Sequence, residues 1–259
     1  NHLELFSQVQ VEDQLKIGFD GLVLSIDSIS KNSDLIIANV IATGNVSSNS
    51  ALDVTNRDLK LNSLTNFDIS AIRKYVAKGL EYVFLSFTNN ERDIIELSKI
   101  ISDCQTDLPK PKIIAKIESI AGMKNLDQIL PIVNGILIDR GDLSREVSIS
   151  RIPMATIYIN NKCKLNNVPC YVATNVLDSM INAPLPSRAE ISDLFNIYEL
   201  GVSGIVLAAE VAIGKYPVEC VHVVNYMHTI YQNSDIDDFF NMQKFVFNNE
   251  LPNELKYWL

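Results

Sequence analysis

Two rhythms of apolar and polar residues divide the sequence near residue 56. Before that point, short β-type runs at 14–19, 21–27 and 34–43 alternate with turn sequences rich in Gly, Asn, Ser and Asp. Turn residues between β-branched runs are typical of antiparallel strands. We therefore expect residues 1–56 to form a small antiparallel β domain.

From residue 57 onward, apolar runs of strand length alternate with helical patterns. The predicted strands are 82–87, 112–118, 135–140, 169–175 and 204–210. Each precedes a stretch of helical periodicity, and we interpret the apolar stripe within the last one, 218–231, as core packing. Continuous apolar strands followed by helices indicate parallel βαβ units with both sheet faces covered. Such units build either a (β/α) barrel or an open doubly wound sheet.

The residues that follow the predicted strands favour the barrel. No Gly-x-Gly-x-x-Gly motif follows the first strand and no phosphate-binding P-loop occurs, although open nucleotide-binding sheets use these motifs. Barrel enzymes instead gather polar groups from several strand ends. Such groups here are Ser86, Lys116, Glu118, Arg140, Asp142, Thr174, Asn175 and Glu210. We predict an α/β fold in which residues 57–230 form part of a TIM-type (β/α) barrel, followed by a tail over 231–259.

Lys116 and Glu118 are the clearest local indication of a functional site in the sequence. Residues two apart on a strand point to the same face, so an ammonium and a carboxylate lie side by side at the end of a buried strand. Glu118 and Asp142 follow consecutive strands, and two carboxylates with open positions suit Mg²⁺. Lys116 would then face the same substrate, where it could neutralise negative charge or shuttle a proton.

The next strand ends add groups that bind oxyanions. Gly141 permits close approach of the backbone, and the amides after it open a short helical turn that could hold a carboxylate. Thr174 adds a hydroxyl at the following strand end. Together these residues predict a site for a small oxyacid bound with Mg²⁺, in which the metal and Lys116 stabilise enolate charge.

Composition excludes several other classes of partner. The net charge of -9 argues against nucleic acid or an anionic membrane as the main partner, because both require basic patches. The longest apolar runs are too short to span a bilayer. The four cysteines are scattered without a Cys-x-x-Cys pair, so we interpret them as thiols of a cytoplasmic protein.

Four long motifs, in this order, resemble the pyruvate kinase family. They are KIIAKIESIAG (112–122), GILIDRGDLS (135–144), PCYVATNVLDSMINAPLPSRAEISD (169–193) and GIVLAAEVAIGKYPVECV (204–221). The resemblance covers roughly residues 10–230, and the N-terminal β unit resembles part of that family's mobile lid domain. It implies transfer of a phosphoryl group from phosphoenolpyruvate to ADP, which yields pyruvate and ATP.

The resemblance also implies roles for single residues. Lys116 would stabilise the enolpyruvate and help to protonate it, and Glu118 and Asp142 would bind Mg²⁺. The backbone amides of Gly141 and Asp142, with Thr174, would hold the pyruvate carboxylate. The supporting members would be Ser86, Arg140 and Glu210. The family also uses K⁺, but its potassium ligands have no match in this chain.

The sequence departs from the family in several places. The family barrel has eight strands, whereas five are predicted here, and the strands without a match carry the residues that grip the phosphoryl group. The family's Ser-Gly-Glu-Thr reads Ala208-Ala209-Glu210-Val211, and its Glu-Asn-His reads Glu118-Ser119-Ile120. Its paired aspartates before the lid glycine read Phe19-Asp20. We expect these changes to affect nucleotide handling and phosphoryl transfer more than binding of Mg²⁺ or pyruvate.

Three expectations follow from these departures. An open sheet edge is unfavourable, so we expect an N-terminal segment, or association with a second copy in a homo-oligomer, to complete the barrel. One alternative to the kinase is a Mg²⁺-dependent aldolase or decarboxylase that uses the same enolate site without ADP. The other is a non-catalytic relative that retains only the fold.

Overall fold

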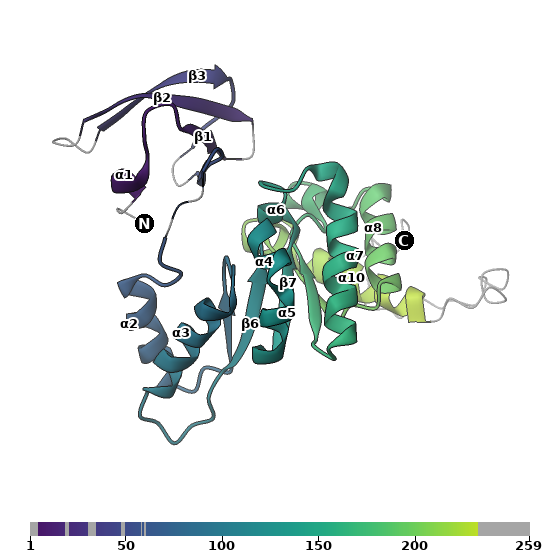
Figure 1. Ribbon diagram of the computed structural model, residues 1–259. Helices are drawn as coiled ribbons and strands as arrows, with labels where there is room; N and C mark the ends of the chain where they lie inside the picture. The colour runs from purple at the N-terminus through teal and green to yellow at the C-terminus, as the bar shows by residue number, and fades with distance from the viewer. Residues whose placement is uncertain are drawn as a thin grey trace. The chain divides into compact units, whose positions relative to one another are not determined.

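The structure is a computed structural model, and its contacts divide the chain into two compact units, residues 1–72 and 73–259. Figure 1 shows that each unit has its own sheet. The residues that the structure describes are 5–18, 21–30, 35–47, 50–57, 59 and 61–232. The Phe19-Asp20 pair and the predicted tail from residue 233 onward lie outside these ranges.

The first unit is a four-stranded antiparallel sheet in the order β3-β2-β1-β4. Its elements are α1 (Leu5–Gln8), β1 (Gln14–Ile17), β2 (Leu22–Ser30), β3 (Leu35–Ala42) and β4 (Leu52–Val54). Val9, Leu15 and Ile26 form its small core. The antiparallel β unit predicted from turn-separated apolar runs is therefore confirmed.

The second unit is built on a parallel sheet whose five strands pair in chain order, β5-β6-β7-β8-β9. The strands are β5 (Tyr82–Leu85), β6 (Lys112–Ile117), β7 (Gly135–Asp139), β8 (Cys170–Ala173) and β9 (Gly204–Val206). Every residue of β7 is buried, as expected for a strand covered on both faces. Five consecutive parallel strands with helices between them confirm the prediction of an incomplete TIM-type barrel.

The strands end earlier than the apolar pattern predicts, and the reason is local backbone geometry. Phe87, Thr174 and Asn175 have φ angles of 48°, 63° and 52°, and such left-handed residues cannot continue a strand. The strand predicted over 204–210 is wrong beyond Val206, because Glu210 lies in a short helix. Ala-Glu-Val-Ala favours a helical turn, and the amide of Ala208 donates to the carboxylate of Glu210 (3.0 Å) at the start of that turn.

Helices follow the strands of the parallel sheet, as the sequence predicts. The helices after α1 are α2 (Asn66–Val76), α3 (Glu91–Ser102), α4 (Ile120–Lys124), α5 (Leu126–Ile129), α6 (Arg140–Leu143), α7 (Ile152–Leu165), α8 (Arg188–Glu199), α9 (Ala209–Ala212) and α10 (Pro217–Gln232), with the 3₁₀ turns η1 (Leu130–Ile132), η2 (Ile149–Arg151) and η3 (Asp178–Ile181). Of these, α2 and α9 are additional to the prediction. Capping boxes begin α3 and α8, where Asn90 with Asp93 and Ser187 with Glu190 satisfy the first amides of the helix. Among helices within the described ranges, none combines the length and apolar character that crossing a bilayer demands.

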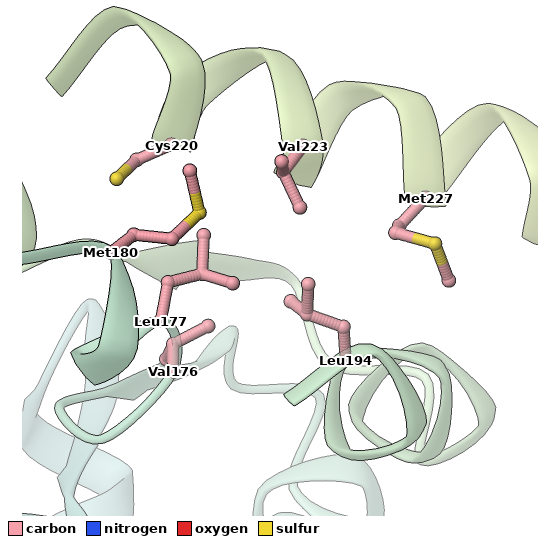
Figure 2. Close-up of a cluster of buried hydrophobic side chains, with 7 residues drawn as sticks. All are labelled: Val176, Leu177, Met180, Leu194, Cys220, Val223 and Met227. Atoms are coloured by element: carbon pink, nitrogen blue, oxygen red, sulfur yellow. The ribbon is translucent and has the colours of Figure 1, made fainter. Parts of the chain in front are cut away.

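Helix α10 packs its apolar stripe onto η3 and α8 (Figure 2). Cys220, Val223 and Met227 follow the spacing of one helix face and meet the fully buried Met180 and Leu194. The interpretation of this stripe as core packing is confirmed. Burial of a side chain such as Leu194 contributes about 1.5–3 kcal/mol to stability, so this cluster anchors α8 firmly.

Candidate functional site

The carboxyl ends of β6, β7 and β8 meet at one edge of the parallel sheet. Lys116 lies near the end of β6, and Glu118 directly follows that strand. Asp139 is the last residue of β7, and Thr174 follows β8. Lys116 pairs with Leu137 and Asp139 with Ala173 in the strand register, so polar side chains from three strands gather at the same level.

Lys116 lies between two carboxylates. Its Nζ atom is 2.6 Å from Oε1 of Glu118 and 3.0 Å from Oδ2 of Asp139. Glu118 is 2% exposed and Asp139 is 5% exposed. The second oxygen of Glu118 accepts a short hydrogen bond from the backbone amide of Phe87. The expected pairing of Lys116 with Glu118 is therefore present, and a third group from the next strand joins it.

Burial and pairing act in opposite directions on the pKa values of this cluster. Burial alone would lower the pKa of Lys116, but its two carboxylate partners more than offset this, so the pKa is raised. Burial would raise the pKa of Asp139, but Lys116, the Thr174 hydroxyl and the Asp142 amide together lower it. Burial dominates at Glu118, and its pKa is raised despite Lys116 and the Phe87 amide. Lys116 is thus an ammonium and Asp139 a carboxylate at neutral pH.

Thr174 connects this cluster to the start of α6. Its Oγ1 accepts a hydrogen bond from the amide of Gly141 (2.7 Å) and lies 3.0 Å from Oδ1 of Asp139, to which it can donate. A Cβ atom on Gly141 would lie 3.2 Å from the same oxygen, which is closer than such contacts normally come. Glycine at 141 therefore allows the hydroxyl and the amide to meet.

Asp142 lies in the first turn of α6 beside the cluster. Its amide points to Oδ1 of Asp139 at the long distance of 3.4 Å, and its carboxylate is 3.4 Å from the guanidinium of Arg145. The amides of Gly141 and Asp142, which the sequence predicts to hold a carboxylate, thus have acceptors within the chain. The long bond of the Asp142 amide is the weaker of the two, so this donor is the easier one for a substrate to engage.

The cluster offers a set of oxygen ligands that suits a hard cation. Glu118, Asp139 and Asp142 each provide a carboxylate oxygen, and these oxygens all lie within 4.8 Å of one another. Mg²⁺ takes one or two protein carboxylates and completes its shell with water and substrate oxygens. The residues therefore fit Mg²⁺, and Asp139 joins the two ligands predicted from the sequence.

The three predicted supporting residues have different surroundings. The guanidinium of Arg140 bonds to the carbonyls of Thr174 and Asn175 and to Asp193. It therefore contacts the site loop, which is the loop after β8 that begins with Thr174 and Asn175. Ser86 is exposed after β5, and within the described part of the chain no hydrogen bond or ion pair joins it to the cluster. Glu210 is fully buried in α9 and bonds to the amide of Ala208. The structure therefore brings Arg140 to the site, whereas Ser86 and Glu210 do not contact the cluster of Lys116, Glu118 and Asp139 among the described residues.

Fold and site together define a class of protein. A parallel sheet of barrel type that gathers carboxylates, an ammonium and a hydroxyl at its carboxyl edge is the arrangement of (β/α)-barrel enzymes. The particular family then follows from comparisons with known proteins. The family described as "Pyruvate kinase, barrel domain" matches residues 1–221. The chain belongs to the pyruvate kinase family.

Individual relatives agree with this assignment. Plastidial pyruvate kinase 3 of Arabidopsis thaliana is 35% identical over 230 residues, which are 89% of this chain and 39% of that protein. Pyruvate kinase of Methanocaldococcus jannaschii is 35% identical over 197 residues, 76% of this chain and 43% of that protein. The crystal structure of a pyruvate kinase from Cryptosporidium parvum aligns with a TM-score of 0.78 at 27% identity, covering 90% of this chain and 48% of that one. The chain thus spans less than half the length of these three relatives.

Two residues of the site were missed by the reasoning from sequence. Asp139 is the one charged residue in the otherwise apolar run GILID, and a carboxylate at the end of a fully buried strand was a usable signal. Asp193 lies 53 residues from Arg140 in the sequence, and no local pattern connects the two. Asp139 could have been found from the apolar run that it ends, whereas the pairing of Asp193 with Arg140 could be found only from the fold.

Proposed function

We propose that this chain carries the enolate-handling part of a pyruvate kinase site, which transfers the phosphoryl group of phosphoenolpyruvate to ADP. The observation that carries the proposal is the ammonium of Lys116 held between the buried carboxylates of Glu118 and Asp139. Family membership supports the reaction class. Because the chain spans less than half of the relatives described above, the complete reaction is proposed for the whole protein.

The proposed chemistry follows the negative charge of the substrate. When the phosphoryl group leaves for ADP, the oxygen on C2 retains the bonding electrons and the product is the enolate of pyruvate. Lys116 stays protonated because its pKa is raised, so its positive charge can offset the charge on that oxygen. Bound Mg²⁺, held by Glu118, Asp142 and Asp139, would supply further positive charge at the same oxygen.

The reaction ends when a proton reaches C3 of the enolate and yields the methyl group of pyruvate. Lys116 and the hydroxyl of Thr174 are the proposed proton-handling groups, because both lie at this edge of the sheet. The substrate carboxylate would accept hydrogen bonds from the amides of Gly141 and Asp142 and from Thr174. It would replace the acceptors that those amides have within the chain, Oγ1 of Thr174 and Oδ1 of Asp139.

Titration with oxalate tests this proposal, because oxalate resembles the enolate of pyruvate in shape and charge. We expect calorimetry to detect oxalate binding that requires Mg²⁺ and that Glu118→Ala abolishes. Asp127→Ala is the matched control, since Asp127 is an exposed carboxylate that pairs with Lys162 on the surface. The absence of binding by the wild-type chain at any Mg²⁺ concentration would contradict the proposal.

The same cluster would serve a Mg²⁺-dependent lyase of 2-oxo acids, a second candidate that needs none of the phosphoryl-gripping groups without a match in this chain. The replacement of the family's Ser-Gly by Ala208-Ala209 favours instead a non-catalytic relative. Turnover of oxaloacetate without any nucleotide would support the lyase over the kinase. If Lys116→Ala leaves the biological effect of the protein intact, the non-catalytic alternative holds instead.

The proposal includes the K⁺ ion, the completion of the barrel and the cellular compartment. The expected K⁺ ligands and the groups that grip the phosphoryl group have no match in this chain. An N-terminal segment or a second copy would complete the barrel, consistent with β5 and β9 as sheet edges within the described residues. The four free thiols fit the cytoplasm as the expected compartment.

A further inference from the structure

The loop after β8 contains two consecutive residues in a backbone conformation that they rarely adopt. Thr174 and Asn175 have φ angles of 63° and 52°, in the left-handed region that glycine normally occupies. For a β-branched residue such as Thr174 this conformation is a genuine outlier. Such residues persist only where surrounding structure holds them, so a group that holds this loop is required.

Arg140 is that group. Its Nε and Nη2 atoms donate to the carbonyl of Thr174 at 3.2 and 3.0 Å, and Nη2 also donates to the carbonyl of Asn175 at 2.7 Å. One planar guanidinium therefore fixes the carbonyls of both left-handed residues. Arginine suits this task because its donors form a rigid fork.

Asp193 fixes the guanidinium in turn. Its Oδ2 accepts a hydrogen bond from Nη1 of Arg140 at 2.7 Å, which leaves the other donors of the fork directed at the loop. The adjacent residue Leu194 is fully buried in the cluster of Figure 2. The carboxylate of Asp193 is therefore held by a helix that is anchored in the core.

The loop matters because of where it places one hydroxyl. Oγ1 of Thr174 meets both the amide of Gly141 at 2.7 Å and Oδ1 of Asp139 at 3.0 Å. We propose that Asp193 and Arg140 form a positioning pair, which acts through the left-handed loop to hold the Thr174 hydroxyl in the enolate site. The effect on turnover rests on the function proposed above, whereas the effect on the hydroxyl does not.

The direct test is the amide resonance of Gly141 in the ¹⁵N-labelled 259-residue chain, because that amide donates to Oγ1 of Thr174. Thr174→Val keeps the shape of the side chain and removes the acceptor, so it defines the shift for a lost hydrogen bond. We expect Asp193→Ala to move the Gly141 resonance at least halfway toward the Thr174→Val position. Asp127→Ala, the same substitution at another ion-paired aspartate, should leave it unchanged.

Asp193→Ala is expected to fold because the side chain is 39% exposed and its loss leaves no buried cavity. If it does not fold, Asp193→Asn decides instead, since it keeps the shape and weakens the bond to Arg140 by removing the charge. A Gly141 resonance at the wild-type position in a folded Asp193→Ala or Asp193→Asn variant would overturn the positioning role.

The second readout is exchange of the methyl protons of pyruvate with D₂O in the presence of Mg²⁺, which requires the enolate but no nucleotide. We expect Asp193→Ala to lower kcat for exchange about tenfold, with KM for pyruvate and the Kd for Mg²⁺ changed less than threefold. In the Thr174→Val background, Asp193→Ala should have no further effect on kcat. An equal and independent loss in that background would mean that Asp193 does not act through Thr174.

The two readouts separate the two proposals. A shifted Gly141 resonance in a chain that catalyses no exchange supports the positioning pair and counts against the proposed function. Wild-type exchange together with an unmoved Gly141 resonance supports the function and overturns the positioning pair.

Discussion

Two fully or almost fully buried glutamates of the parallel-sheet unit have very different surroundings. Glu118 follows β6, and both of its oxygens have partners: the ammonium of Lys116, which belongs to the same strand, and the amide of Phe87, which follows β5. Glu210 lies in α9 and bonds to the amide of Ala208, only two residues away. Its other oxygen has no hydrogen-bond partner among the described residues. Burial alone therefore does not distinguish the two glutamates; Glu118 differs because its partner Lys116 also pairs with Asp139 of the neighbouring strand.

The charged groups near Glu118 and near Glu210 also differ. Near Glu118 the ammonium of Lys116 compensates for the carboxylates, and a bound cation would add to this compensation. Near Glu210, burial and the negative charges of Glu210 and Glu219 raise the pKa of the Cys220 thiol to about 11. The first region thus combines an ammonium with carboxylates, as the proposed function requires, and the second does not.

The largest expected effect comes from removing the cation of the first region. Lys116→Met leaves two neighbouring buried carboxylates without their ammonium, so the free energy of unfolding should fall by about 3–5 kcal/mol. Exchange of pyruvate methyl protons should fall by about 10²–10³-fold, as when a charge-stabilising donor is removed. Urea denaturation and proton NMR measure the two effects.

Lys162→Met is the matched control, since Lys162 pairs with the exposed Asp127 on the surface. Such exposed pairs contribute about 0–1 kcal/mol. If Lys116→Met were as stable and as active as Lys162→Met, the special role of the first region would be disproved.

The two glutamates themselves give the next largest difference. Glu118→Gln removes a charged ligand, and we expect Mg²⁺-dependent oxalate binding to weaken by at least about tenfold. Glu210→Gln keeps an acceptor for the Ala208 amide, so oxalate binding should change less than twofold. Calorimetric titration of the two variants side by side measures this difference, and equal losses would show that Glu210 belongs to the site after all.

A smaller effect is expected where the site loop meets α6. Gly141→Ala places a methyl group 3.2 Å from Oγ1 of Thr174, so that oxygen must move by a few tenths of an ångström. We expect kcat for pyruvate proton exchange to fall roughly tenfold, with little change in the urea midpoint. Unchanged kcat would mean that the close approach of Gly141 to Thr174 has no functional value.

A third glutamate, Glu190, should show the smallest effect and a clear dependence on pH. Its burial would raise its pKa, but hydrogen bonds from Ser179 and Ser187 lower it overall. These bonds stabilise the folded state fully above the ordinary glutamate pKa of about 4.3, and the stabilisation is lost as the pH falls through the lowered value. Glu190→Gln should therefore reduce the free energy of unfolding by about 1 kcal/mol at pH 7.

The difference between Glu190→Gln and the wild type should disappear once the pH is below the lowered pKa of Glu190. Urea denaturation across pH 3–7 measures it, with Glu199→Gln as the control on the exposed face of the same helix. A difference that stays constant over this range would show that the charge of Glu190 is not what stabilises the start of α8.

Much of this architecture could be predicted from the sequence because its signals are local. Continuous apolar runs predict β5 to β9, and the alternation of side chains along a strand brings Lys116 beside Glu118. The stripe of Cys220, Val223 and Met227 predicts the packed face of α10. These elements follow from periodicity over a few residues, and the structure agrees with them.

The features that could not be predicted depend on backbone conformation and long-range pairing. Thr174 and Asn175 lack the glycine that usually marks left-handed backbone, so the end of β8 was predicted two residues too late. The strand predicted to reach Glu210 ends at Val206 because the following residues form a helix. The bond from Arg140 to Asp193 joins residues far apart in the sequence, and only the packing of α8 brings them together.

The most direct test of the central claim is exchange of pyruvate methyl protons with D₂O in the presence of Mg²⁺, measured by proton NMR without nucleotide. The claim is that this chain, through Lys116 and its carboxylates, stabilises the enolate of pyruvate. It predicts exchange by the wild-type chain and by Lys162→Met, and a loss of about 10²–10³-fold in Lys116→Met. A wild-type rate no faster than that of folded Lys116→Met would contradict it.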